Sequence, residues 1–68
     1  DEKLFVVSSE FMTQIYIYDI SGKQVKRFEM DYPEKKFATQ ISLAEGIYVI
    51  KVKLKNGIVM SRKLINKK

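Results

Sequence analysis

The side chains of this chain that could perform chemistry are few, and the most plausible pair is Ser61 with Lys63. The two residues are separated by one position, so on a β-strand both side chains would point to the same face. A serine activated by a lysine can act as a nucleophile, but only where the lysine is desolvated in a pocket. A chain of 68 residues that forms a small sheet offers little concave surface. We therefore do not expect this pair to be catalytic.

Other catalytic or metal-binding groups are missing or poorly spaced. The sequence has no histidine and no cysteine, which removes the commonest general base, the commonest metal ligand and every thiolate. The three glycines do not form a phosphate-binding loop. The eight carboxylates lie mostly in predicted turns, in a loop or near the N-terminus, and no two have the spacing of an acid–base pair: Asp1, Glu2, Glu10, Asp19, Glu29, Asp31, Glu34 and Glu45. We predict a protein that is not an enzyme, with no metal ion and no cofactor.

Positive charge is concentrated at the C-terminal end. From Ile47 onward the sequence has seven basic residues and no acidic one, namely Lys51, Lys53, Lys55, Arg62, Lys63, Lys67 and Lys68. Such charges can protect a sheet edge from aggregation or bind an acidic surface. Binding of nucleic acid would use Tyr16, Tyr18 or Phe28 to stack on bases. The excess of positive charge lies in one hairpin instead of around a groove, however, and the tyrosines alternate with isoleucines as packed residues do, so we predict no nucleic-acid partner.

Apolar and polar residues alternate with a period of two, and helical periodicity is missing. Leu4–Ser8 predicts a short strand. In residues 14–18 two isoleucines alternate with two tyrosines, which predicts a strand with one apolar face. Asp19–Gly22 predicts a turn, because aspartate can accept bonds from the following backbone and glycine can adopt a positive φ. With residues 24–30 as the returning strand, this segment predicts a β-hairpin.

The middle of the chain predicts a loop and a further strand. Residues 31–36 contain Pro33 and four charged residues, which favours an exposed loop. Phe37–Leu43 alternates again, as a half-buried strand does, and Ala44–Gly46 predicts a turn. With the C-terminal hairpin these elements amount to about six strands and no helix, so the sequence predicts an all-β fold, a small sandwich.

The C-terminal hairpin is centred on Asn56-Gly57, a strong turn signal. A two-residue turn would place Lys51 opposite Arg62, which is unfavourable for like charges. A three-residue loop over Lys55–Gly57 instead places Arg62 opposite Ile50 and pairs apolar residues with apolar residues: Leu54 with Ile58, Val52 with Met60 and Tyr48 with Leu64. We therefore predict the three-residue loop with a bulge at Gly57.

Three segments carry a resemblance to a known family. Ile15–Val25 is similar to a hydrophobic-Tyr-Asp-hydrophobic-Ser-Gly-Lys-x-Val motif. Leu43–Val52 is similar to a Leu-x-x-Gly-hydrophobic-Tyr-hydrophobic-hydrophobic-x-Val motif. Asn56-Gly57 and then Arg62–Lys67 match a turn and a terminal Lys-Leu-hydrophobic-x-Lys element. In this order they resemble the type IX secretion C-terminal sorting domains (the Por secretion tail) of Bacteroidetes cargo proteins. Ala44 stands where the family often has proline, and the usual Asn-Pro entry is missing, as expected of a fragment cut inside the domain.

The resemblance implies a fold and a function. The fold would be an immunoglobulin-like β-sandwich of about six to seven antiparallel strands, forming one C-terminal domain over residues 1–68 of a longer secreted protein. The domain would direct its cargo from the periplasm through the outer-membrane type IX translocon to the cell surface or the medium. A sortase-like surface peptidase would then remove the domain and attach the cargo to anionic lipopolysaccharide. Its partners would be translocon components and this peptidase, and an exposed edge strand could also pair with a second copy.

The same resemblance assigns recognition to the hairpin from Gly46 to Lys68. The residues it singles out are Gly46, Tyr48, Val49, Val52, Asn56, Gly57, Lys63, Leu64, Ile65, Lys67 and Lys68. On this reading, removal of Lys63–Lys68 should abolish export and leave most of the fold intact. The alternative is an adhesive or carbohydrate-binding sandwich with no sorting role, for which that deletion would matter only through stability.

Overall fold

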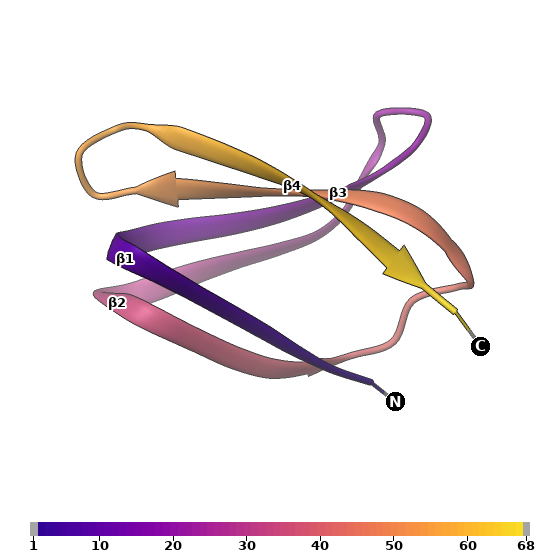
Figure 1. The fold of residues 1–68 in the computed structure, drawn as a ribbon, viewed down its shortest axis with the longest axis horizontal. Coiled ribbons are helices and arrows are strands. Elements are labelled where there is room, and N and C mark those ends of the chain that lie inside the picture. Colours follow the sequence, from indigo (N-terminus) through magenta and orange to yellow (C-terminus); the bar gives the residue numbers. More distant parts are fainter. Residues whose placement is uncertain (1, 68) are drawn as a thin grey trace.

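The computed structural model describes residues 2–67, which form four antiparallel strands in one sheet. The strands are β1 (Glu2–Asp19), β2 (Gln24–Ile41), β3 (Gly46–Leu54) and β4 (Val59–Asn66), in the spatial order β2-β1-β3-β4 (Figure 1). The described residues contain no helix, and hence none that is long and apolar enough to cross a membrane. The predicted all-β fold is confirmed.

The long β1–β2 hairpin bends in its middle. Val7 lies opposite Lys36 and Gln14 opposite Glu29, but the register shifts between these pairs, where Met12 lies opposite Glu34. Only the second half of β1, from Met12 to Asp19, also pairs with β3. The first half of β1 and the last part of β2 therefore form a two-stranded arm, which Figure 1 shows running at an angle to the rest of the sheet.

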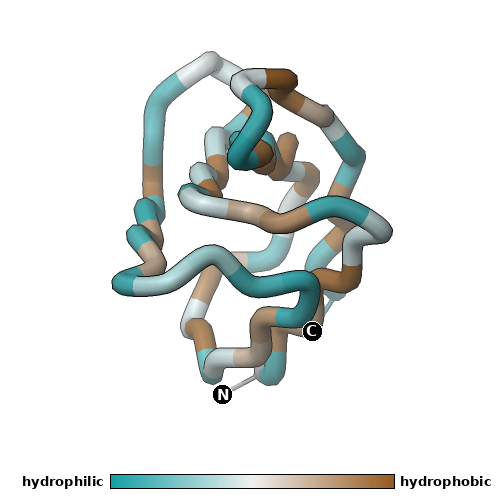
Figure 2. Tube along the Cα trace, turned by 90° about the vertical axis from the view of Figure 1, so that its left-hand side faces the viewer, coloured by the Kyte–Doolittle hydropathy of each residue, from teal (hydrophilic) through white to brown (hydrophobic). Residues whose placement is uncertain are grey.

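The bend allows one sheet to enclose its own core. Leu4 and Ile41 from the arm belong to the same buried cluster as residues from β1, β3 and the β2–β3 connection: Met12, Ile15, Ile17, Leu43, Tyr48, Ile50, Val52 and Leu54. From the side, the chain curves around this interior (Figure 2). Phe28 and Phe37 pack against the cluster with ring centroids 5.3 Å apart, so Phe28 does not lie on an exposed base-stacking surface.

The predicted strand count is wrong. The segments expected as separate strands, Leu4–Ser8 and residues 14–18, are parts of the single strand β1. Residues 31–36 are not a loop but belong to β2. Strand β2 is an edge strand, so the missing N–H of Pro33 need not cost a ladder hydrogen bond and the charged side chains there stay exposed. Residues 2–67 form four strands in one sheet, and the immunoglobulin-like sandwich of six to seven strands is not confirmed.

Candidate recognition surface

The loop between β3 and β4 has the predicted three-residue form. The Leu54 N–H donates to the Ile58 carbonyl at 2.8 Å, and the Gly57 N–H donates to the Leu54 carbonyl at 2.9 Å. The Asn56 Oδ1 accepts a bond of 3.0 Å from the Ile58 N–H. Gly57 has a φ of +92°, a conformation that glycine adopts without steric cost. The pairing of Val52 with Met60, Tyr48 with Leu64 and Ile50 with Arg62 confirms the predicted register.

The C-terminal end of the hairpin is tied to the chain before β3. The side-chain Nδ2 of Asn66 donates to the Leu43 carbonyl at 2.9 Å and to the Ala44 carbonyl at 3.0 Å. The Tyr48 hydroxyl donates to the same Ala44 carbonyl at 2.7 Å. Asn66 is 9% exposed and is the buried polar residue of the described chain. Sequence reasoning missed its role, although an asparagine inside an otherwise strand-forming segment is a signal that its side chain has a specific partner.

Replacing Asn66 with alanine should therefore destabilise the domain by about 1–3 kcal/mol, because the Leu43 carbonyl loses this donor and the Ala44 carbonyl keeps only the bond from the Tyr48 hydroxyl. Urea unfolding followed by circular dichroism would measure this change. Lys67→Ala is the matched control, since Lys67 is exposed and should leave the unfolding midpoint unchanged. Equal midpoints for the two variants would show that Asn66 does not anchor the strand.

The β1–β2 turn is built on one carboxylate. The Asp19 Oδ1 accepts bonds from the Ser21 N–H at 2.9 Å, the Ser21 Oγ at 2.6 Å and the Lys23 N–H at 3.0 Å. Gly22 has a φ of +89° and its N–H donates to the Asp19 carbonyl at 3.0 Å. The predicted turn is confirmed. The hydrogen bond from the Ser21 side chain, with those from the backbone, lowers the pKa of Asp19 below its ordinary value.

This lowered pKa makes the turn sensitive to acid. Because the pKa of Asp19 is lower in the folded than in the unfolded chain, its ionised form stabilises the fold above the unfolded pKa. That stabilisation is lost as the pH falls below about 4 and passes the folded pKa. We expect Asp19→Asn to be less stable than the parent at pH 7 and to lose less stability on acidification. Unfolding both proteins at pH 7 and at low pH tests this, and parallel losses would contradict it.

The second half of the sheet has a basic and aromatic outer face. We define this outer face by the side chains that point away from the core from the four paired strands: Gln14, Tyr16, Tyr18, Arg27, Glu29, Ile47, Val49, Lys51, Lys53, Val59, Ser61, Lys63 and Ile65. Four of these are cations and only Glu29, which is paired with Arg27, is an anion. Lys51 Nζ lies 5.4 Å from the Tyr18 ring centroid, and the Arg27 guanidinium 6.0 Å from that of Tyr16. This face suits an anionic partner.

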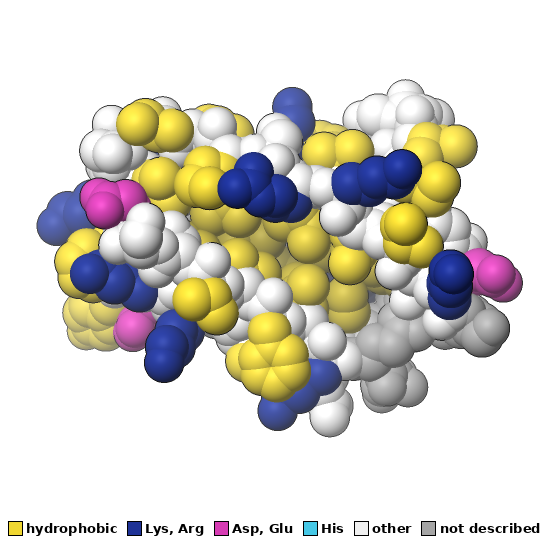
Figure 3. Space-filling model, viewed as in Figure 1, with side chains coloured by type: hydrophobic (Ala, Val, Ile, Leu, Met, Phe, Trp, Pro, Cys, Tyr) yellow, Lys and Arg dark blue, Asp and Glu magenta, His cyan; other side chains and the backbone are white. Residues whose placement is uncertain are grey.

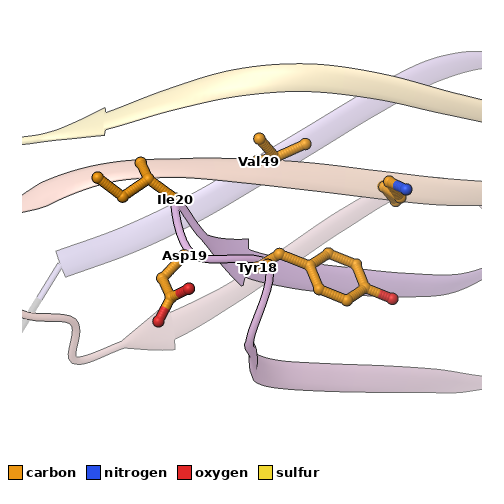
Figure 4. A pocket seen from close by; sticks show the side chains of 6 residues that line it. Tyr18, Asp19, Ile20 and Val49 are labelled. Carbon is orange, nitrogen blue, oxygen red and sulfur yellow. The ribbon is translucent and has the colours of Figure 1, made fainter.

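Two of the motif segments meet in a shallow pocket at the turn end of the outer face. It is lined by Tyr18, Asp19, Ile20 and Gly22 from the turn and by Val49 and Lys51 from β3. Figure 4 shows the turn residues around the end of β1, with Val49 coming from the neighbouring strand. The Ile20 side chain is 79% exposed, so the pocket has an apolar residue available for contact. The two segments are therefore adjacent in space as well as ordered in the sequence.

Ser61 and Lys63 are both exposed on the outer face. Lys63 is therefore not desolvated, as a lysine that activates a nucleophile must be. The described residues also bring together no group of three or more candidate metal ligands.

A family model described as a secretion system C-terminal sorting domain matches residues 1–67. The chain belongs to this family of type IX sorting domains. The match extends the resemblance, which began near Ile15, over nearly the whole chain. The family is one of sorting signals and not of enzymes, and it implies a secreted protein. Comparisons with curated proteins and with solved structures gave no match.

In this sorting domain, the residues that the resemblance singled out divide into two groups. The first supports the hairpin: Tyr48 and Val52 are buried, Leu64 is half-buried against the core, and Asn56 and Gly57 form the turn. Gly46 begins β3 with a φ of +159°, near full extension, and an added Cβ there would lie 3.8 Å from the Tyr48 ring, an ordinary contact. The second group is accessible: Val49 is half-buried, while Lys63, Ile65 and Lys67 are exposed. Lys68 lies outside the described residues.

Proposed function

We propose that this sorting domain is the C-terminal module of a longer exported protein and directs that cargo through the outer-membrane type IX translocon. The observation that carries the proposal is the family match over residues 1–67. A sheet face that carries four cations and one anion fits recognition by a partner protein better than catalysis.

We further propose that the β3–β4 hairpin is the part that the secretion machinery recognises. Its outward residues Lys63, Ile65 and Lys67 are exposed, although the strand end needs no particular charge there for folding. Its inward residues Leu64 and Asn66 hold the strand in place. The hairpin thus presents a fixed pattern of charged and apolar side chains, as a recognition element requires.

The later steps of the pathway are part of the same proposal. After passage to the surface of a Bacteroidetes cell, a sortase-like peptidase would remove the domain and attach the cargo to anionic lipopolysaccharide. The described residues offer no metal cluster and no desolvated serine–lysine pair with which the domain could perform this cleavage itself. Cleavage is therefore assigned to a partner enzyme.

A fusion experiment tests this function. The chain would follow a periplasm-directed fluorescent reporter in a bacterium that has type IX machinery, and the reporter without the chain would be the control. We expect only the fusion to reach the surface or the medium, with its tail removed. A folded fusion that stays in the periplasm would contradict the sorting function and leave the adhesive alternative.

A further inference from the structure

Strand β4 has a free edge. It is the last strand of the sheet, and within residues 2–67 only β3 pairs with it. The Leu54 N–H bonds to the Ile58 carbonyl, so in the antiparallel ladder the even-numbered residues of β4 bond to β3. The backbone N–H and C=O groups of Val59, Ser61, Lys63 and Ile65 therefore point away from the sheet. These groups form a template for one more strand.

An apolar groove lies between this edge and the arm. It is lined by Val6, Val7 and Ser8 from the first half of β1, by Met60 and Arg62 from β4, and by Met12 and Val52 from the strands between them. Figure 3 shows hydrophobic side chains in a hollow on this side of the molecule, with Lys and Arg side chains along its upper border. Val7 is 72% exposed. A strand added beside β4 would place every second side chain over this groove.

The positive charges near the free edge favour an acidic partner over a second copy of this chain. Arg62 lies at the rim of the groove, and Lys63 points to the outer face beside the free edge. From Ile47 to the end of the chain there is no acidic residue to neutralise them. A second copy that paired β4 with β4 would bring its own Arg62 and Lys63 against these cations, which is unfavourable. An added strand whose acidic side chains point to the outer face would instead place opposite charge near Lys63.

We propose that the free edge of β4 binds an extended segment of a partner protein in which apolar and acidic residues alternate. The segment adds as a fifth strand, its apolar side chains cover the groove, and its acidic side chains lie near Lys63 and the lysines of β3. This inference rests on the proposed function in one respect, namely that the partner belongs to the secretion machinery.

Hydrogen exchange of the backbone amides tests the pairing directly. The probe is a soluble synthetic peptide with the length of β4 in which valine and glutamate alternate, and the control peptide has lysine in place of glutamate. Added to the intact domain, the first peptide should slow exchange at Val59, Ser61, Lys63 and Ile65 only, because the alternate amides already bond to β3. The lysine peptide should have no effect. The proposal would be overturned if exchange slowed equally at the odd-numbered and even-numbered amides of β4. Equal binding of the two peptides would also overturn it.

A proline variant supplies the second test. Ser61→Pro removes an N–H that β3 does not use, so an edge strand should tolerate it. We expect it to weaken binding of the glutamate peptide roughly tenfold, as loss of one hydrogen bond in a paired strand would. Ser61→Ala keeps the N–H and should bind like the parent. If both variants fold and bind equally, or if the chain without peptide self-associates through β4 and protects the same amides, strand addition by a partner is wrong.

Export of the same variants separates this inference from the proposed function. If the intact fusion is exported and Ser61→Pro is exported equally well, the sorting function stands and pairing at β4 is not its mechanism. If not even the intact fusion is exported, the sorting function fails, while the exchange experiment still decides whether β4 accepts an acidic strand.

Discussion

Ile17→Ala is expected to unfold much of the domain near physiological temperature. The Ile17 side chain is fully buried in β1, and its partner across the sheet, Ile50, belongs to the same cluster. Removing it should cost about 2–5 kcal/mol. A domain of this size without a disulfide has a total stability of about the same magnitude, so little would remain.

Thermal unfolding followed by circular dichroism would measure this loss. Ile20→Ala is the matched control, because it deletes the same atoms three residues later from a side chain that is 79% exposed. Its stability should change by no more than about 0.5 kcal/mol. Equal melting curves for the two variants would show that Ile17 does not contribute to the core.

Deletion of residues 63–68 is expected to destabilise the fold strongly, in contrast to the expectation from sequence that most of it would stay intact. The deletion removes the pairing of four β4 residues with β3, from Lys63 to Asn66. It also removes Leu64 from the core and both hydrogen bonds of Asn66. The combined cost should be about 3 kcal/mol or more.

A shorter deletion is the control for this prediction. A chain that ends at Asn66 keeps Leu64 and the bonds of Asn66 and should unfold at the same urea concentration as the full chain. If deletion of residues 63–68 leaves the midpoint unchanged as well, the end of β4 contributes nothing to stability. The large deletion is therefore a poor test of recognition, because it changes the fold and the exposed charges together.

The local elements could be predicted from the sequence because short-range chemistry determines them. Asp19 and Gly22 have the side chain and the backbone freedom that their turn needs, and both act as expected. The like charges of Lys51 and Arg62 excluded one register of the last hairpin, and the structure has the other. Alternation also placed Ile15 and Ile17 on the buried face of β1.

The bend in the long hairpin could not be predicted in the same way. Pro33 and its charged neighbours favour a loop over a strand that has partners on both sides. Because β2 is an edge strand, it accommodates these residues. Residues 2–7 belong to the same strand as residues 14–18 because the arm folds over the core, and this packing depends on contacts between residues far apart in sequence. The bonds from Asn66 to Leu43 and Ala44 also join positions far apart in sequence, so the local pattern could not indicate which residues Asn66 contacts.

The family resemblance identified residues without separating their roles. Tyr48 is buried and Leu64 packs against the core, whereas Lys63 and Lys67 are exposed. The burial of each side chain separates packed residues from exposed residues, and the sequence alone does not give this burial at the end of a strand. It also explains why single substitutions of exposed residues are better probes of recognition than truncation.

Export of a reporter fused to two charge-reversed variants of the domain tests recognition through the β3–β4 hairpin directly. Lys63→Glu with Lys67→Glu changes the exposed charges of the hairpin, and Lys35→Glu with Lys36→Glu makes the same change in net charge on the exposed part of β2. Both should fold like the parent. We predict that the hairpin variant is exported roughly tenfold less or worse, as expected when like charges meet at an interface, while the β2 variant is exported normally. Equal export of the two folded variants would contradict recognition through the β3–β4 hairpin.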